Sequence, residues 1–192
     1  IICLLIILFA GDYIKNFWND YSFIHNTTKE LYILSEELES DFSSFIQPIK
    51  EQRDSLEHIV RAYSRMCSVS LEDLNKEDQE YVKSNLSKAL GHIFRAFFDC
   101  ADILGIILRE HLSTQLRNFS YSQIVQVWPK YETYRKQLIR MPKEFAKLRS
   151  SKDVAKKSDE IIAMVKQYKK CIDELFAIYD EFMEDIYPKL NA

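Results

Sequence analysis

Apolar side chains recur at intervals of three and four residues along most of the chain. This spacing predicts helices that each bury one face, and the first run sustains it from Ile14 to Met66 in a coiled-coil-like manner. The positions of that run expected to face inward are Ile14, Phe17, Tyr21, Ile24, Thr28, Leu31, Ser35, Leu38, Phe42, Phe45, Ile49, Gln52, Leu56, Ile59, Tyr63 and Met66. Only Thr28, Ser35 and Gln52 among them are polar.

Local signals divide this first run. Thr27 followed by Glu30 has the spacing of a capping box, so we expect the helix to break and restart there. Pro48 lacks an amide hydrogen and is expected to kink whatever helix passes through it. The run is predicted to end within residues 67–73.

Two further runs complete the helical pattern. Asn75 with Asp78 three residues later marks a helix start, and the next break is expected at residues 149–152. Residues 117–122 are either a loop or a strained continuation, and Pro129 and Pro142 interrupt the stripe that follows. The inward positions are Leu86, Leu90, Ile93, Phe97, Cys100, Leu104, Ile107, His111, Ile124, Val127, Tyr131, Tyr134, Leu138, Met141, Phe145 and Leu148, then Ile161, Val165, Tyr168, Cys171, Leu175, Ile178, Phe182 and Ile186.

The composition also favours helices over sheets. The chain has 192 residues with only three glycines and four prolines, whereas a sheet protein needs such residues for its many turns. We therefore predict an all-α fold with at least two thirds helix and no sheet. The expected form is an elongated antiparallel bundle of three to four long, proline-kinked helices, forming a single domain over residues 12–192.

The first eleven residues are predicted to be an apolar leader. Residues 1–10 carry no charge, but they are half as long as the roughly 20 residues that span a bilayer. The run has the length of a signal-peptide core, and it equally suits part of a membrane anchor. Three glycosylation sequons follow, at Asn26, Asn85 and Asn118. We expect a secreted or extracellular, membrane-tethered protein, with the cytosolic face of a membrane as the alternative.

Charge is distributed unevenly. The net charge is only −3, which argues against a nucleic-acid partner, yet residues 129–157 are strongly basic. This segment is expected either to pair with the acidic residues 36–41 or the acidic last helix, or to form an exposed patch for an anionic lipid, a glycan or an acidic protein. Its candidate binding residues are Lys130, Arg135, Lys136, Arg140, Lys143, Lys147, Arg149, Lys152, Lys156 and Lys157.

Catalytic and cofactor motifs are missing from the sequence. None of the four histidines belongs to a Glu-x-x-His or His-Glu-x-x-His motif, and the three isolated glycines cannot form a phosphate-binding loop. We therefore predict a protein that is not an enzyme and has neither metal nor cofactor. Cys100 and Cys171 lie at similar heights in the expected bundle, so they are either a disulfide pair or two buried thiols.

Three functions remain open at this stage. The first is a secreted or tethered bundle that binds another protein or an anionic surface, with a homodimer through the long helices as one form. The second is a cytosolic membrane-binding module, because long helices over residues 27–67, 76–149 and 152–187 resemble the layout of BAR domains. The third is a carrier of an apolar ligand, for which the cavity lining would be Phe94, Phe97, Phe98, Phe176 and Phe182.

Overall fold

The computed structural model describes residues 2–38, 45–68, 75–150 and 157–192, with side chains from residue 12 onward. About 93% of this described part is helical and none of it is strand, which confirms the predicted all-α class. None of the helices in these ranges holds a stretch long and apolar enough to cross a bilayer.

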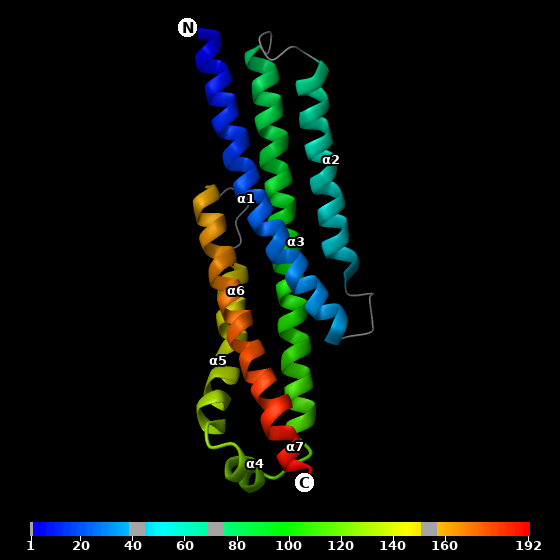
Figure 1. Cartoon of the computed structure of the whole chain (residues 1–192), viewed down its shortest axis with the longest axis vertical. Helices are drawn as coiled ribbons and strands as arrows, with labels where there is room; N and C mark the ends of the chain where they lie inside the picture. Colours follow the sequence, from blue (N-terminus) through cyan, green and yellow to red (C-terminus); the bar gives the residue numbers. More distant parts are fainter. Residues whose placement is uncertain (1, 39–44, 69–74, 151–156) are drawn as a thin grey trace.

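Figure 1 shows the arrangement of the helices. The chain runs down α1, returns along α2, descends α3, turns through α4, ascends α5 and descends again along α6. There are more helices than the three to four expected. Their bounds are α1 Ile2–Leu38, α2 Ile46–Ser68, α3 Lys76–Leu116, α4 Tyr121–Val127, α5 Tyr131–Ser150, α6 Ser158–Asp180, the π-helical segment η2 Glu181–Ile186 and α7 Tyr187–Leu190.

The break expected at Thr27 is absent, because α1 is continuous there. The hydroxyls of Thr27 and Thr28 instead donate to the carbonyl oxygens of Phe23 and Ile24, at 2.8 and 2.7 Å. These bonds satisfy the hydroxyls within the helix, so no cap is needed. Pro48 lies in the first turn of α2, where a missing amide hydrogen costs little, rather than kinking a longer helix.

The predicted start of α3 is confirmed. Asn75 caps it by accepting a 2.9 Å hydrogen bond from the Asp78 amide. The helix expected over residues 76–149 is divided into α3, α4 and α5, with a capping box from Ser120 to Gln123 starting α4. The three long helices of a BAR-like layout are therefore not present.

Two hydrophobic clusters share α3. The smaller one joins Phe17 of α1, Ala62 of α2 and Val82, Leu86 and Ala89 of α3. The larger one gathers the lower half of α3 with α5 and α6, and it includes Ile24 and Leu31 of α1. Helix α3 thus contacts α2 in its first half and α5 and α6 in its second half, while α1 contributes to both clusters (Figure 1).

The aromatic residues proposed as a ligand cavity fill the larger cluster. Phe94, Phe97, Phe98 and Phe182 are fully buried, and Phe176 packs against the same cluster. Phe98 meets Phe94 and Phe97 edge to face, at centroid distances of 4.8 and 5.5 Å. Rings in such contact make up a close-packed interior, so these residues do not support the carrier hypothesis.

The inward face of α2 agrees with the predicted one only in part, since Ile59, Tyr63 and Met66 pack half-buried against the smaller cluster. Its buried residues are Pro48, Ser55 and Ala62, whereas Ile49 and Leu56 are exposed. The small side chains let α2 approach its neighbours closely, and the Ser55 hydroxyl donates to the Ala89 carbonyl oxygen of α3 at 2.9 Å. Close approach through small residues leaves Ile49 and Leu56 on the outer side of α2.

Candidate functional site

The outer surface of α5 carries four cations in one stripe. Lys136, Arg140, Lys143 and Lys147 follow one another at intervals of four, three and four residues, and all are exposed. We call these four residues the basic face of α5. The opposite side of the helix buries Met141, Phe145 and Leu148, so the helical period separates cations from core residues.

Phe145 fixes the rotation of α5 about its axis. Its ring stacks on Tyr168 of α6 at 5.2 Å, with an interplanar angle of 16°. Gly105 of α3 leaves room for this ring, because a Cβ atom there would lie 3.5 Å from Phe145 Cε2 and 3.3 Å from Ile172 Cδ1. The Arg109 guanidinium lies over the same ring at 5.1 Å.

Glu181 of η2 anchors the beginning of α5. Its carboxylate accepts hydrogen bonds from Trp128 Nε1 at 2.9 Å and Tyr134 Oη at 2.7 Å, and it pairs with Lys130 Nζ at 3.3 Å. Burial raises the pKa of Glu181, but these hydrogen bonds outweigh burial and hold the pKa below its ordinary value. The anchor is therefore charged at neutral pH.

An ion pair holds the end of α5. Arg149 Nη1 lies 3.5 Å from Asp102 Oδ2 on α3, and the Tyr168 hydroxyl donates to the other oxygen of the same carboxylate. Helix α5 is thus attached at both ends and in the middle, which leaves the basic face directed to solvent.

The structure divides the ten predicted basic residues into distinct groups. Lys130 pairs with Glu181 of the acidic last helices, Arg149 pairs with Asp102, and Arg135 lies 3.9 Å from Glu132. The four residues of the basic face form no ion pair with another described residue. Lys157 is exposed at the start of α6, whereas Lys152 and Lys156 lie outside the described residues, as do residues 39–41 of the acidic stretch.

Ile139 adds an apolar side chain to this surface. It is 62% exposed and lies between Lys136, Arg140 and Lys143 along the helix. Glu144 is the acidic residue within this stretch, and it lies close enough to Cys171 of α6 to contribute to raising the pKa of that thiol, after the larger effect of burial. The surface therefore combines several cations with one exposed aliphatic group.

The three sequons have different environments. Asn26 and Asn118 are exposed, on α1 and in the turn after α3. Asn85 is buried on α3, where its amide donates to the Tyr81 carbonyl oxygen at 3.0 Å and its oxygen lies 2.9 Å from His58 Nδ1. A glycan on Asn85 is incompatible with this packing.

The disulfide between Cys100 and Cys171 is not formed, because both are free thiols. Burial raises the pKa of the Cys100 thiol to about 12, with a smaller contribution from Asp99. Cys100 lies close enough to Tyr32 of α1 to affect its pKa, while Cys171 lies near Glu144 of α5. The two cysteines therefore face different neighbours of the bundle.

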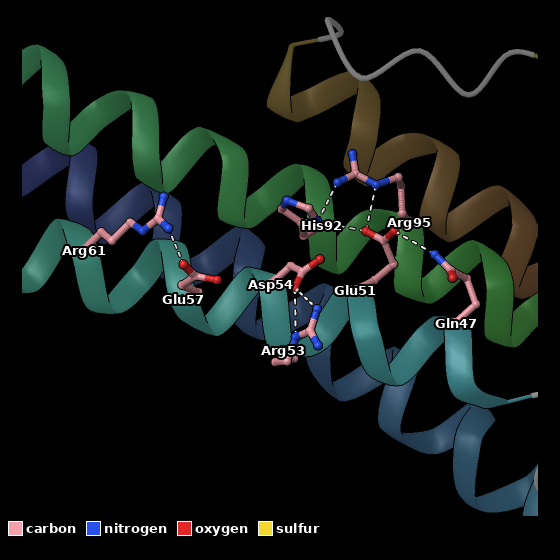
Figure 2. Close-up of polar contacts among 8 residues, drawn as sticks. All are labelled: Gln47, Glu51, Arg53, Asp54, Glu57, Arg61, His92 and Arg95. Atoms are coloured by element: carbon pink, nitrogen blue, oxygen red, sulfur yellow. Dashed lines mark hydrogen bonds and ion pairs between the residues drawn. The ribbon is translucent and has the colours of Figure 1, made fainter.

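A polar network between α2 and α3 was not predicted. Figure 2 shows Glu51 of α2 reaching across to His92 and Arg95 of α3, with Glu51 Oε2 at 2.8 Å from His92 Nδ1 and 2.8 Å from Arg95 Nε. Gln47 donates to the other oxygen of Glu51 at 3.0 Å. His92 also stacks on His58, with ring centroids 5.3 Å apart.

This network aligns α2 with α3 and does not form a metal site. Within the described ranges, no three His, Cys, Asp or Glu residues are grouped so that they could hold a metal ion. Burial raises the pKa of Glu51, yet the bonds from His92 and Arg95 outweigh it and lower the pKa overall. These bonds therefore favour the carboxylate anion.

Acidification is expected to weaken the contact between α2 and α3. Because the pKa of Glu51 is lower in the folded chain than in the unfolded one, its contribution to stability is complete above the unfolded pKa of about 4.3 and is lost as the pH falls through the folded value. Urea unfolding measured at several pH values should show this loss. Glu51→Gln should unfold more easily at neutral pH and lose part of the acid dependence, and an unchanged dependence would contradict the assignment.

No family model, no curated protein and no solved structure matches this chain. The function must therefore be inferred from the surfaces and contacts of the chain itself.

Proposed function

We propose that this chain is a non-enzymatic helical-bundle protein, elongated and largely antiparallel, that binds an anionic membrane surface through the basic face of α5. The observation that carries the proposal is the stripe of four exposed cations, none paired with another described residue, on a helix held firmly from its other side. Lipid phosphate and carboxylate groups are the chemistry that such a stripe attracts.

Ile139 favours a lipid surface over a sulfated glycan. An aliphatic side chain that is 62% exposed among cations can enter the boundary between headgroups and acyl chains, whereas a glycan offers no apolar interior. Cations near an anionic membrane contribute about 1 kcal/mol each, so four of them give about 4 kcal/mol, which corresponds to millimolar affinity. The contact of one basic face is therefore weak and sensitive to salt.

Anionic lipids are concentrated in the cytoplasmic leaflet, so we favour the cytosolic face of a membrane as the location. The burial of Asn85 removes one of the three sequons that suggested secretion. The exposed Asn26 and Asn118 support the alternative, a secreted or membrane-tethered protein.

Reversing the four charges is expected to abolish binding to vesicles. The native chain should cosediment with vesicles of phosphatidylserine and phosphatidylcholine at low salt. Binding should fall steeply as salt is added, because charges are screened beyond about 8 Å at physiological ionic strength. The variant with Lys136, Arg140, Lys143 and Lys147 all changed to Glu should not bind, while its circular dichroism stays helical because these side chains are exposed.

A matched control carries the same change of charge elsewhere. Lys15, Lys29, Lys88 and Lys189 are exposed and scattered over α1, α3 and α7, so changing them to Glu should leave most of the binding. Equal loss in both variants would mean that only net charge matters and would refute a specific face. Binding to heparin without binding to vesicles would replace the lipid by a glycan.

A further inference from the structure

The outer side of α2 carries a row of large apolar side chains that the bundle does not cover. Ile46, Ile49, Leu56 and Val60 are 53%, 49%, 59% and 54% exposed. With Arg53 they follow one another at intervals of three, four, three and four residues, which is the spacing of a coiled-coil seam. We call these five residues the α2 seam.

The bundle lies on another side of α2. The buried residues of this helix recur every seven positions, at Pro48, Ser55 and Ala62. Each of them follows a seam residue by two positions. At about 100° per residue, the seam is centred roughly 140° around the helix from that buried line. A second helix placed on the seam would therefore leave both bundles pointing away from each other. Figure 1 shows α2 at the edge of the molecule, consistent with this access.

We propose that the α2 seam binds the α2 seam of a second copy of this chain, with the two helices antiparallel. In the register centred between Asp54 and Ser55, Ile49 faces the partner's Val60, and Ile46 lies at each end of the contact. Arg53 then faces the partner's Leu56, and the same contacts recur through the two-fold axis. Large apolar side chains that are half exposed in one copy become covered in the pair.

The charges beside the seam fit this register. Lys50 is exposed and has no ion pair with another described residue, and in the antiparallel pair it lies opposite the partner's Glu57. Glu57 contacts Arg61 of its own helix through one oxygen, which leaves the other oxygen for a second cation (Figure 2). The two-fold axis produces this Lys–Glu contact twice.

A parallel pairing of the same helices is disfavoured by Arg53. In register, a parallel dimer would place Arg53 against the partner's Arg53, and like charges at the centre of a seam repel. It would also separate Lys50 from the partner's Glu57. In the antiparallel pair Arg53 meets Leu56 instead, and it retains Asp54 of its own chain, whose Oδ1 lies 2.9 Å from Arg53 Nε and 2.7 Å from Nη2.

Sedimentation equilibrium of the full chain tests whether the dimer exists. The native chain should form dimers in a concentration-dependent manner, and Val60→Glu should weaken association by at least about a hundredfold, because each dimer would bury two carboxylates against the apolar Ile49 of the partner. The matched control is Ile139→Glu, an equally exposed isoleucine on α5 that should leave the dimer intact. A native chain that stays monomeric at high concentration would overturn the proposal.

Charge exchange tests the register. Lys50→Glu and Glu57→Lys should each weaken the dimer by about tenfold, since each places two like-charge pairs beside the seam, and the double variant should recover most of that loss. The charge control is Lys88→Glu on α3, which should have no effect. In a chain with Ile49→Cys, Val60→Cys and Cys67→Ala, oxidation should link the two copies into a covalent dimer. Failure of both recovery and cross-linking would refute the antiparallel register.

The dimer and the membrane surface can fail independently. Val60→Glu lies on α2 and should leave the basic face of α5 able to bind vesicles, although more weakly because a dimer presents two such faces. Ile139→Glu should reduce vesicle binding without changing the molecular mass in solution. Each variant thus addresses one proposal and serves as the control for the other.

Discussion

Replacing Trp128 with alanine is expected to lower the free energy of unfolding by about 3–5 kcal/mol, the cost of removing a large buried aromatic side chain. Trp128 is 1% exposed and closes the turn between α4 and α5. Its ring lies 5.5 Å from Phe182 and 5.4 Å from Tyr134, and its Nε1 donates to Glu181. The substitution removes both the packing and a donor to the anchor of α5.

Trp128→Phe separates these two effects. Phenylalanine retains much of the ring contact but loses the bond to Glu181, so we expect a smaller loss of about 1–3 kcal/mol. Chemical unfolding followed by circular dichroism measures both values. If the alanine variant lost less than 1 kcal/mol, the buried position of Trp128 would be wrong.

Replacing Tyr168 with alanine should be about as damaging. Tyr168 is fully buried where three helices meet, with its ring 5.0 Å from Phe98 of α3 and 5.2 Å from Phe145 of α5. We expect a loss of about 3–5 kcal/mol, because the cavity would lie between α3, α5 and α6 and none of these helices can close it alone. Thermal or urea unfolding would report the loss directly.

The hydroxyl of Tyr168 is tested by Tyr168→Phe. This variant keeps the ring contacts and removes the hydrogen bond to Asp102, whose carboxylate retains Arg149, so a loss of about 1 kcal/mol is expected. A phenylalanine variant as unstable as the alanine variant would show that the hydroxyl, and not the packing of the ring, carries the stabilisation.

Much of the helical pattern was predictable because core packing follows the helical period. The inward stripes of α1, α3 and α6 are confirmed at Ile24, Leu31, Phe97, Leu104 and Leu175, all of which are fully buried. The start at Asn75 was predictable for a local reason, since a cap depends only on residues three positions apart.

The α2 face and the helix count could not be predicted in this way. Spacing alone cannot tell which of two amphipathic sides faces the bundle, and here the small Ser55 and Ala62 are buried while Leu56 is exposed. The capping pattern at Thr27 failed because a threonine hydroxyl can also be satisfied by the carbonyl one turn earlier.

The candidate site was predicted as a list of cations, but not as a surface. The sequence does not show which of these cations is paired and which is free of an ion pair. Arg149, for example, pairs with Asp102 through a tertiary contact between α5 and α3. The α2–α3 network was missed for the same reason. Glu51 and His92 are separated by 41 residues, so no short motif joins them.

The sharing of α3 between two hydrophobic clusters has a consequence for how the molecule opens. Detaching α2 exposes the smaller cluster while leaving the larger one closed, because the larger cluster is formed by α3 with α1, α5 and α6. Local opening should therefore proceed as separate cooperative units, with α2 released at lower free energy than the rest. The amide hydrogens of α3 near Phe97 and Leu104 then exchange with solvent only in global unfolding, which makes the middle of α3 the last helical segment to lose its protection.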